Sequence, residues 1–213
     1  MNTPDKRHLP PPDTLPPLSP HKSPMGGLYF IELIFYNVRR NTSIELTNGK
    51  WLLLNGSRMI VPNLLRVIGR LAETGPVRVV DGGFMFDIIV AFQNTGRKIE
   101  IAERIQVSSA YNCHQMLSVL ENMDNGPAPF VVLDLLRTFT YTNVDFKERS
   151  RLLNECLEQL DRLAESSGGL VSVHIPNVLC QAERELLDMV IVAAVYMNHV
   201  EMAGKIPAEM RVS

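Results

Sequence analysis

The chain has 213 residues, of which 46% are hydrophobic and 21% are charged, and its formal net charge is −2. This length fits one domain with a sizeable core. The slightly acidic balance excludes a broad electrostatic attraction to nucleic acid and leaves room only for a local basic patch.

The cysteines and the apolar runs indicate a soluble, cytoplasmic protein. Cys113, Cys156 and Cys180 are odd in number and share no C-x-x-C spacing, which favours reduced thiols over a disulfide framework. No signal-peptide pattern follows Met1. The longest uninterrupted apolar run, residues 189–197, is too short to span a bilayer, so we expect a buried helix there and no membrane partner.

Residues 1–25 form a proline-rich segment that we expect to be a disordered or semi-rigid tail. Eight of the fourteen prolines lie in residues 1–24, and proline removes backbone donors and favours extended conformations. Two interpretations stay open: a solvated leader, or a segment that docks in a partner's groove. Residues 26–213 are then expected to form a single α/β domain.

The first part of this domain carries one hairpin signal. Residues 28–38 are rich in aromatic and β-branched side chains, but their periodicity does not decide between strand and helix. Residues 43–47 and 50–54 flank Asn48-Gly49, a pair that favours the positive φ angles of a tight turn. This pattern predicts a hairpin across residues 43–54, whose second strand is buried on both faces.

Apolar runs and helical patterns then alternate to the end of the chain. Strands are expected at residues 51–54, 77–80, 104–110, 130–133 and 170–175. Helices are expected at residues 64–71, 86–92, 114–123, 146–165 and 182–198. This alternation predicts a three-layer αβα fold with a mainly parallel sheet, in which ligands bind beyond the carboxyl ends of the strands.

Several segments in order resemble the ATPase core of RecA- and RadA-type recombinases, within the P-loop NTPase superfamily. VRVVDGGF (residues 77–84) is similar to the recombinase strand and turn with D-T-E-G-x-F. IQVSSAYNCHQML (residues 105–117) is similar to the segment with A-F-N-x-x-H-Q-M-L, with one residue fewer before the histidine. FVVLDLL (residues 130–136) matches the Walker B strand, which ends in a Mg²⁺-directed aspartate. The resemblance spans about residues 40–176 and implies a RecA-like fold.

The Walker A phosphate-binding loop is degenerate. It would begin at Gly56, and the second glycine, the lysine and the Ser/Thr of G-x-x-x-x-G-K-[ST] are replaced by Val61, Pro62 and Asn63. Pro62 has no backbone donor and no charge, and Val61 places a branched side chain where backbone would approach a phosphate. Arg58 is a candidate replacement for the lysine, or else an ordinary surface arginine. We expect the loop to be closed by Met59, Ile60 or Val61.

The acidic positions are only partly retained. The recombinase glutamate that activates water is matched by Gly83, whereas Asp81 and Asp134 are kept. Asp134 has two open interpretations, a metal ligand or an aspartate that caps a strand end, because one acidic residue does not hold a phosphate–metal pair alone. His114 and Gln115 are equally open to a helix-capping role.

These residues predict a RecA-like, non-hydrolysing protein with no required cofactor. The resemblance implies that it acts through protein contacts in DNA recombination or repair, with a recombinase or a second copy of itself as partner. The alternative is a divergent ATP- and Mg²⁺-binding protein or slow ATPase of the RecA-like P-loop class that uses Arg58, Asp81 and Asp134. DNA contact is the weaker expectation, because residues 137–146 hold one arginine and the aromatics Phe139 and Tyr141.

Overall fold

The computed structural model describes residues 29–34, 41–46, 48–56, 61–93, 99–140, 143–174 and 179–196. The predicted proline-rich tail and Arg58 lie outside these residues.

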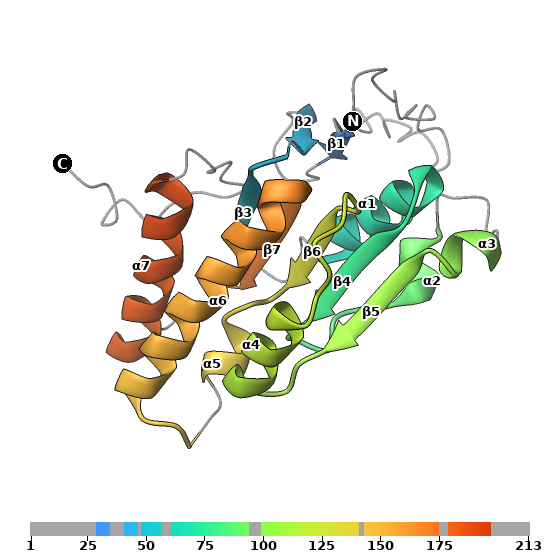
Figure 1. Cartoon of the computed structure of the whole chain (residues 1–213). Helices are drawn as coiled ribbons and strands as arrows, with labels where there is room; N and C mark the ends of the chain where they lie inside the picture. Colours follow the sequence, from blue (N-terminus) through green and yellow to red (C-terminus); the bar gives the residue numbers. More distant parts are fainter. Residues whose placement is uncertain are drawn as a thin grey trace, which may run out of the picture.

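The centre of the molecule is a five-stranded, all-parallel sheet (Figure 1). Its strands are β3 (Trp51–Gly56), β4 (Val77–Asp81), β5 (Ile105–Ser109), β6 (Phe130–Leu133) and β7 (Gly169–His174). They lie in the order β3-β7-β6-β4-β5, so that β3 and β5 are the two edges. All five expected strands are thereby confirmed, and the continuous apolar run of β6 suits a strand covered on both faces.

Seven helices connect or follow these strands within the described part of the chain. They are α1 (Val61–Thr74), α2 (Ile88–Ala91), α3 (Ile99–Ala102), α4 (Cys113–Glu121), α5 (Arg137–Thr140), α6 (Phe146–Ser166) and α7 (Gln181–Tyr196). The five expected helices are present, with α2 shorter than the pattern suggested. The one-turn helices α3 and α5 were not predicted.

Alternate residues of the strands enter two separate cores, which establishes the three layers. Val80 and Val132 pack with α4, α6 and α7 in what we call the α6-side core. Their chain neighbours Val79 and Val131 pack with α1, α2 and α3 in the α1-side core. Successive strand residues point to opposite faces, so the sheet is covered from both sides as predicted.

The predicted hairpin is wrong. β1 (Tyr29–Ile34) pairs antiparallel with β2 (Asn41–Leu46) in a separate two-stranded sheet, whereas β3 pairs parallel with β7. Gly49 does adopt a positive φ of 82°, but its N–H donates to the carbonyl of Ala164 at the end of α6. An Asn-Gly pair identifies a left-handed position without specifying which strand lies beside the next.

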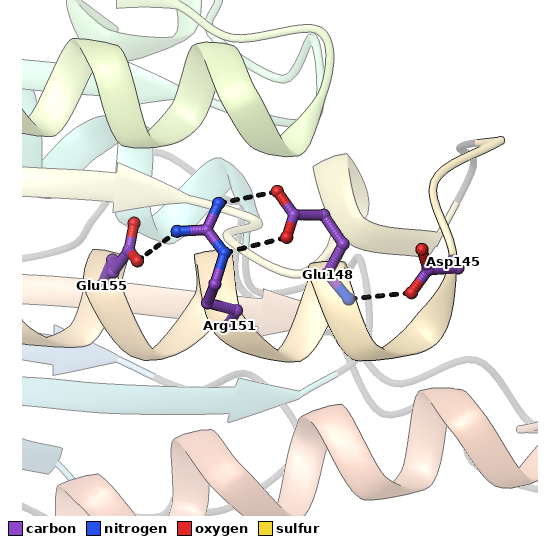
Figure 2. A network of polar contacts seen from close by, with 4 residues as sticks. All are labelled: Asp145, Glu148, Arg151 and Glu155. Atoms are coloured by element: carbon purple, nitrogen blue, oxygen red, sulfur yellow. Dashed lines mark hydrogen bonds and ion pairs between the residues drawn. The ribbon is translucent and has the colours of Figure 1, made fainter.

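One side of α6 carries charged residues exposed to solvent. Asp145 caps the helix by accepting the N–H of Glu148 at 2.9 Å. Figure 2 shows the Arg151 guanidinium held on one side by Glu148, at 2.6 and 2.8 Å, and on the other by Glu155. The hydrogen bond from Arg151 lowers the pKa of Glu148. These exposed pairs stabilise the helix rather than bind a ligand.

The apolar run at the C-terminal end belongs to α7. Val190 and Ala194 are buried in the α6-side core, as expected for a core helix. Among the described residues, we find no helix with the length and apolarity that a bilayer crossing requires.

Candidate functional site

The carboxyl end of β4 is organised by Asp81. Its Oδ1 accepts the N–H groups of Gly83 at 3.1 Å and Met85 at 3.0 Å, and its Oδ2 accepts that of Phe86 at 2.9 Å. The carboxylate is buried, so these three bonds replace the water it would otherwise bind. Asp81 therefore builds the turn that follows β4.

Asp134 ties the end of β6 to β7. It is buried with a positive φ of 52°, and its Oδ1 accepts the N–H of His174 at 3.1 Å. Its own N–H donates to Oγ of Ser172 at 2.9 Å, and that hydroxyl donates to the carbonyl of Val132. The strand-capping interpretation of Asp134 is thus supported by its contacts, and the metal role stays a prediction.

The described residues contain no group of three or more His, Cys, Asp or Glu side chains placed to hold a metal ion. Asp81 and Asp134 nevertheless lie close to each other across the β4–β6 ends, because both turns contact the same glycine. A Cβ on Gly83 would stand 3.0 Å from Cβ of Asp134 and 3.1 Å from Cγ of Met85. A glutamate at this position, as in the recombinases, would need its neighbours to shift.

The preceding glycine is also required by packing. A Cβ on Gly82 would lie 2.9 Å from the carbonyl oxygen of Asp134 and 2.8 Å from Cε of Met116. Its N–H donates to the carbonyl of Leu133 at 2.9 Å, so the turn runs directly against the end of β6. The Gly82-Gly83 pair is therefore explained by close backbone approach.

The three positions that the sequence comparison matched to the phosphate loop, Val61, Pro62 and Asn63, lie at the start of α1. Val61 is partly buried against the α1-side core, Pro62 is exposed, and the Asn63 side chain accepts a hydrogen bond from Arg66 at 3.0 Å. Gly56 ends β3, and its neighbours Arg58, Met59 and Ile60 lie outside the described residues. Of the three side chains expected to close the loop, only Val61 can be placed, and it packs inward.

Two aromatic rings that the sequence interpretation missed stand together beyond β4 and β5. Phe84 and Tyr111 have ring centroids 4.9 Å apart and are 69% and 61% exposed. Phe84 has a positive φ of 54°, a strained conformation for a bulky residue. The Asp81 bonds hold the Phe84 turn, so the protein maintains this strain while presenting an aromatic side chain to solvent.

The turn carrying Tyr111 is held equally firmly. Asn112 caps α4 by accepting the N–H of Gln115 at 2.9 Å, and the Gln115 side chain accepts the N–H of Tyr111 at 2.9 Å. The capping interpretation of Gln115 is thereby supported. His114 is exposed in the first turn of α4.

Exposed apolar side chains are concentrated along the β5 edge of the sheet. Of the large hydrophobic side chains that are exposed in the described residues, only Val192 on α7 lies elsewhere. The others lie on β5, α2, α3 and the two turns: Phe84, Ile88, Ile89, Ile99, Val107 and Tyr111. In Figure 1 these elements surround the β5 edge of the sheet. A concentration of this kind is typical of a protein-contact surface.

A cavity of about 320 Å³ with mixed polar and apolar lining opens between β5 and α4. Gln106, Ser108 and Ser118 line it together with Arg78. The buried Arg78 guanidinium donates to the carbonyls of residues 124, 126 and 128 and to Oγ of Ser167. These bonds hold the loop before β6, so Arg78 has a structural role.

The three cysteines are divided between the core and the surface. All three are free, with Cys113 and Cys156 buried in the α6-side core and Cys180 exposed. Burial raises the pKa of the Cys156 thiol, which keeps it protonated and unreactive.

Neither a scan against protein-family models nor a search of the curated proteins finds a match to this chain. The fold and the contacts at the strand ends therefore define its class: an α/β protein with a five-stranded parallel sheet between two helical layers.

Proposed function

We propose that this is a RecA-like, non-hydrolysing protein that acts through protein contacts, as a partner or regulator in DNA recombination or repair. The observation that carries the proposal is the set of exposed apolar side chains around β5, including Phe84, Ile89 and Tyr111. The recombination setting comes from the order of sequence motifs along residues 40–176.

The strand-end carboxylates favour a structural over a catalytic assignment. Both oxygens of Asp81 accept backbone N–H groups, and Asp134 accepts the N–H of His174. Phosphoryl transfer needs a metal, a cationic group and a water-activating residue around the phosphate. The positions matching the lysine and the glutamate hold Pro62 and Gly83, which supply neither.

The aromatic pair favours protein over nucleic acid as the partner. The described charged side chains nearest in sequence to Phe84 are Asp81 and Asp87, both acidic, whereas nucleic-acid surfaces combine aromatics with cations. Phe139, an aromatic in one expected DNA-contacting segment, is fully buried and cannot stack on a base. Its counterpart Tyr141 lies outside the described residues.

Nucleotide titration tests the non-hydrolysing assignment. Mg-ATP is expected to leave the melting temperature of the wild-type protein unchanged and to release no phosphate. Stabilisation by Mg-ATP that Asp134→Ala abolishes would overturn the proposal and establish the divergent ATP-binding alternative. Because Asp134 also supports the fold, Asp134→Asn serves as the control that keeps an acceptor oxygen at this position.

Photo-crosslinking tests the protein-contact assignment. A benzophenone amino acid is placed at Tyr111 in one sample and at Val192, on α7 near the opposite edge of the sheet, in a control. We expect specific protein adducts from position 111 that position 192 does not give, with a recombinase or a further copy of this chain among them. Equal labelling from both positions would contradict the assignment.

A further inference from the structure

Within the described residues no strand pairs with the outer edge of β5, and this edge offers a regular row of backbone hydrogen-bonding groups. The N–H of Val77 donates to the carbonyl of Arg104 at 2.9 Å, and the N–H of Ala110 donates to the carbonyl of Asp81 at 3.0 Å. Backbone N–H and C=O groups alternate in direction along a strand, so those of the even-numbered residues of β5 point toward β4. The N–H and C=O groups of Ile105, Val107 and Ser109 therefore point away from the sheet.

This edge lacks the features that normally protect an exposed strand. Its sequence, IQVSS, has no charge and no proline, and its register with β4 runs unbroken from Ile105 to Ser109, without a bulge. Edge strands of monomeric proteins usually carry such features because they block pairing with another chain. The opposite edge differs, since Trp51, Leu53 and Leu54 of β3 are all buried.

Both faces of β5 are also open. Val107 is 42% exposed on the α1 side, and Gln106 and Ser108 border the cavity beside α4 on the other. Side chains of an added strand would thus find space on either face. The neighbouring apolar side chains on α2 and α3 extend the contact beyond the strand itself.

We propose that β5 pairs antiparallel with β5 of a second copy of this chain, joining two five-stranded sheets across a twofold axis at Val107. In this register Val107 faces Val107 of the other copy, Gln106 faces Ser108, and Ile105 faces Ser109. Every outward N–H and C=O of both strands then finds a partner, because Val107 sits at a hydrogen-bonded pair position.

The absence of charged side chains on β5 favours a second copy of this chain as the partner strand. Like charges directly opposite each other destabilise strand pairing, and this register of two uncharged strands brings none together. A twofold interface uses the same surface patch on both subunits, so the apolar side chains around β5 are enough to form both halves of the dimer contact. The inference rests on the proposed function only in assuming that this surface makes protein contacts.

The first experiment measures mass in solution with charge-reversed variants of the full chain. In analytical ultracentrifugation at micromolar concentration, the wild type is expected to have about twice the 23.9 kDa mass of the monomer. Val107→Lys and Val107→Glu each place like charges opposite one another, and each is expected to weaken dimerisation about tenfold or more. An equimolar mixture of the two variants is expected to restore the dimer. Val192→Lys, a matched change of an exposed valine on α7, is expected to remain dimeric.

A second variant separates pairing from folding. Val107→Pro removes an N–H that points outward and leaves the bonds to β4 intact, so it is expected to stay folded but monomeric. Hydrogen exchange gives an independent signature: the amides of Ile105, Val107 and Ser109 gain protection with protein concentration, whereas those of Gln106 and Ser108 are protected at every concentration.

Three results would overturn the pairing: a monomeric wild type, a dimer unaffected by Val107→Lys, or a charge mixture that stays monomeric. None of these bears on nucleotide binding, which tests the proposed function separately. A monomeric wild type that still crosslinks a different protein through position 111 would overturn self-pairing and leave the proposed function standing.

Discussion

Replacement of Arg78 by methionine should destabilise the fold. The Arg78 side chain is buried, and its guanidinium bonds to loop carbonyls of Asp124, Gly126 and Ala128 and to Ser167. Burial lowers the pKa of Arg78 and the Asp124 carboxylate opposes this, yet a guanidinium remains charged at neutral pH. Methionine keeps the apolar stem and removes every donor, which leaves the carbonyls of the loop without their partner.

The magnitude follows from the number and setting of these bonds. A hydrogen bond to a charged group contributes about 1.5–3 kcal/mol, and bonds that share one donor group do not add. The adjacent cavity admits water to part of the loop, so we expect a loss of about 2–4 kcal/mol rather than the full sum. In a chain of this size that corresponds to a fall in Tm of about 4–16 °C.

Trp51 provides the assay. It is the single tryptophan, it is fully buried, and its Nε1 donates to Asp161 at 2.7 Å, so its fluorescence reports global unfolding in urea. Arg184→Met, at an exposed position on α7, is the control and should change stability by less than about 0.5 kcal/mol. Equal midpoints for the two variants would refute the structural role of Arg78. The urea midpoint of Arg78→Lys should lie between those of Arg78→Met and Arg184→Met, because one ammonium cannot reach the same set of acceptors.

Three further predictions concern the turns and α6. Gly82→Ala should cost about 1–3 kcal/mol by urea unfolding, because its Cβ would press on the Asp134 carbonyl, whereas Gly75→Ala, with no atom near its Cβ, should be tolerated. Phe84→Asn should leave Tm unchanged or raise it, since asparagine accepts the positive φ, while crosslinking from position 111 weakens; a large fall in Tm would show that the ring supports the fold. Because the pKa of Glu148 is lowered by folding, its ionised carboxylate stabilises the folded state at pH values above its ordinary pKa of 4.5. This stabilisation is lost as the pH falls through the lower pKa of the folded state. Glu148→Gln should therefore make the free energy of unfolding depend less on pH in this acidic range, as urea unfolding at several pH values would show.

The sequence was most informative where burial was continuous. Residues 130–133 and 170–173 are apolar or small on both faces because both faces are covered, so β6 and β7 could be identified from composition alone. The helix α6 was predicted equally well, because its buried apolar residues recur with helical spacing. The four-residue helices α3 and α5 were missed because one turn is too short to show a helical period.

The site was less predictable because it depends on strand order. Phe84 and Tyr111 are 27 positions apart in the printed sequence, and they meet only because β4 and β5 are neighbours. Asp81 and Asp134 could be placed at strand ends, but their acceptor roles depend on the turn geometry that each stabilises. The hairpin failed for the same reason, since local turn chemistry does not determine which strand β3 lies beside.

The three hydrogen bonds at Asp81 bear on how motif residues are interpreted in general. A carboxylate at this strand end is required to shape the turn, so the chain would need an acid here whether or not it ever met a nucleotide. The presence of an aspartate at this strand end is therefore explained by folding alone and is by itself no sign of nucleotide chemistry.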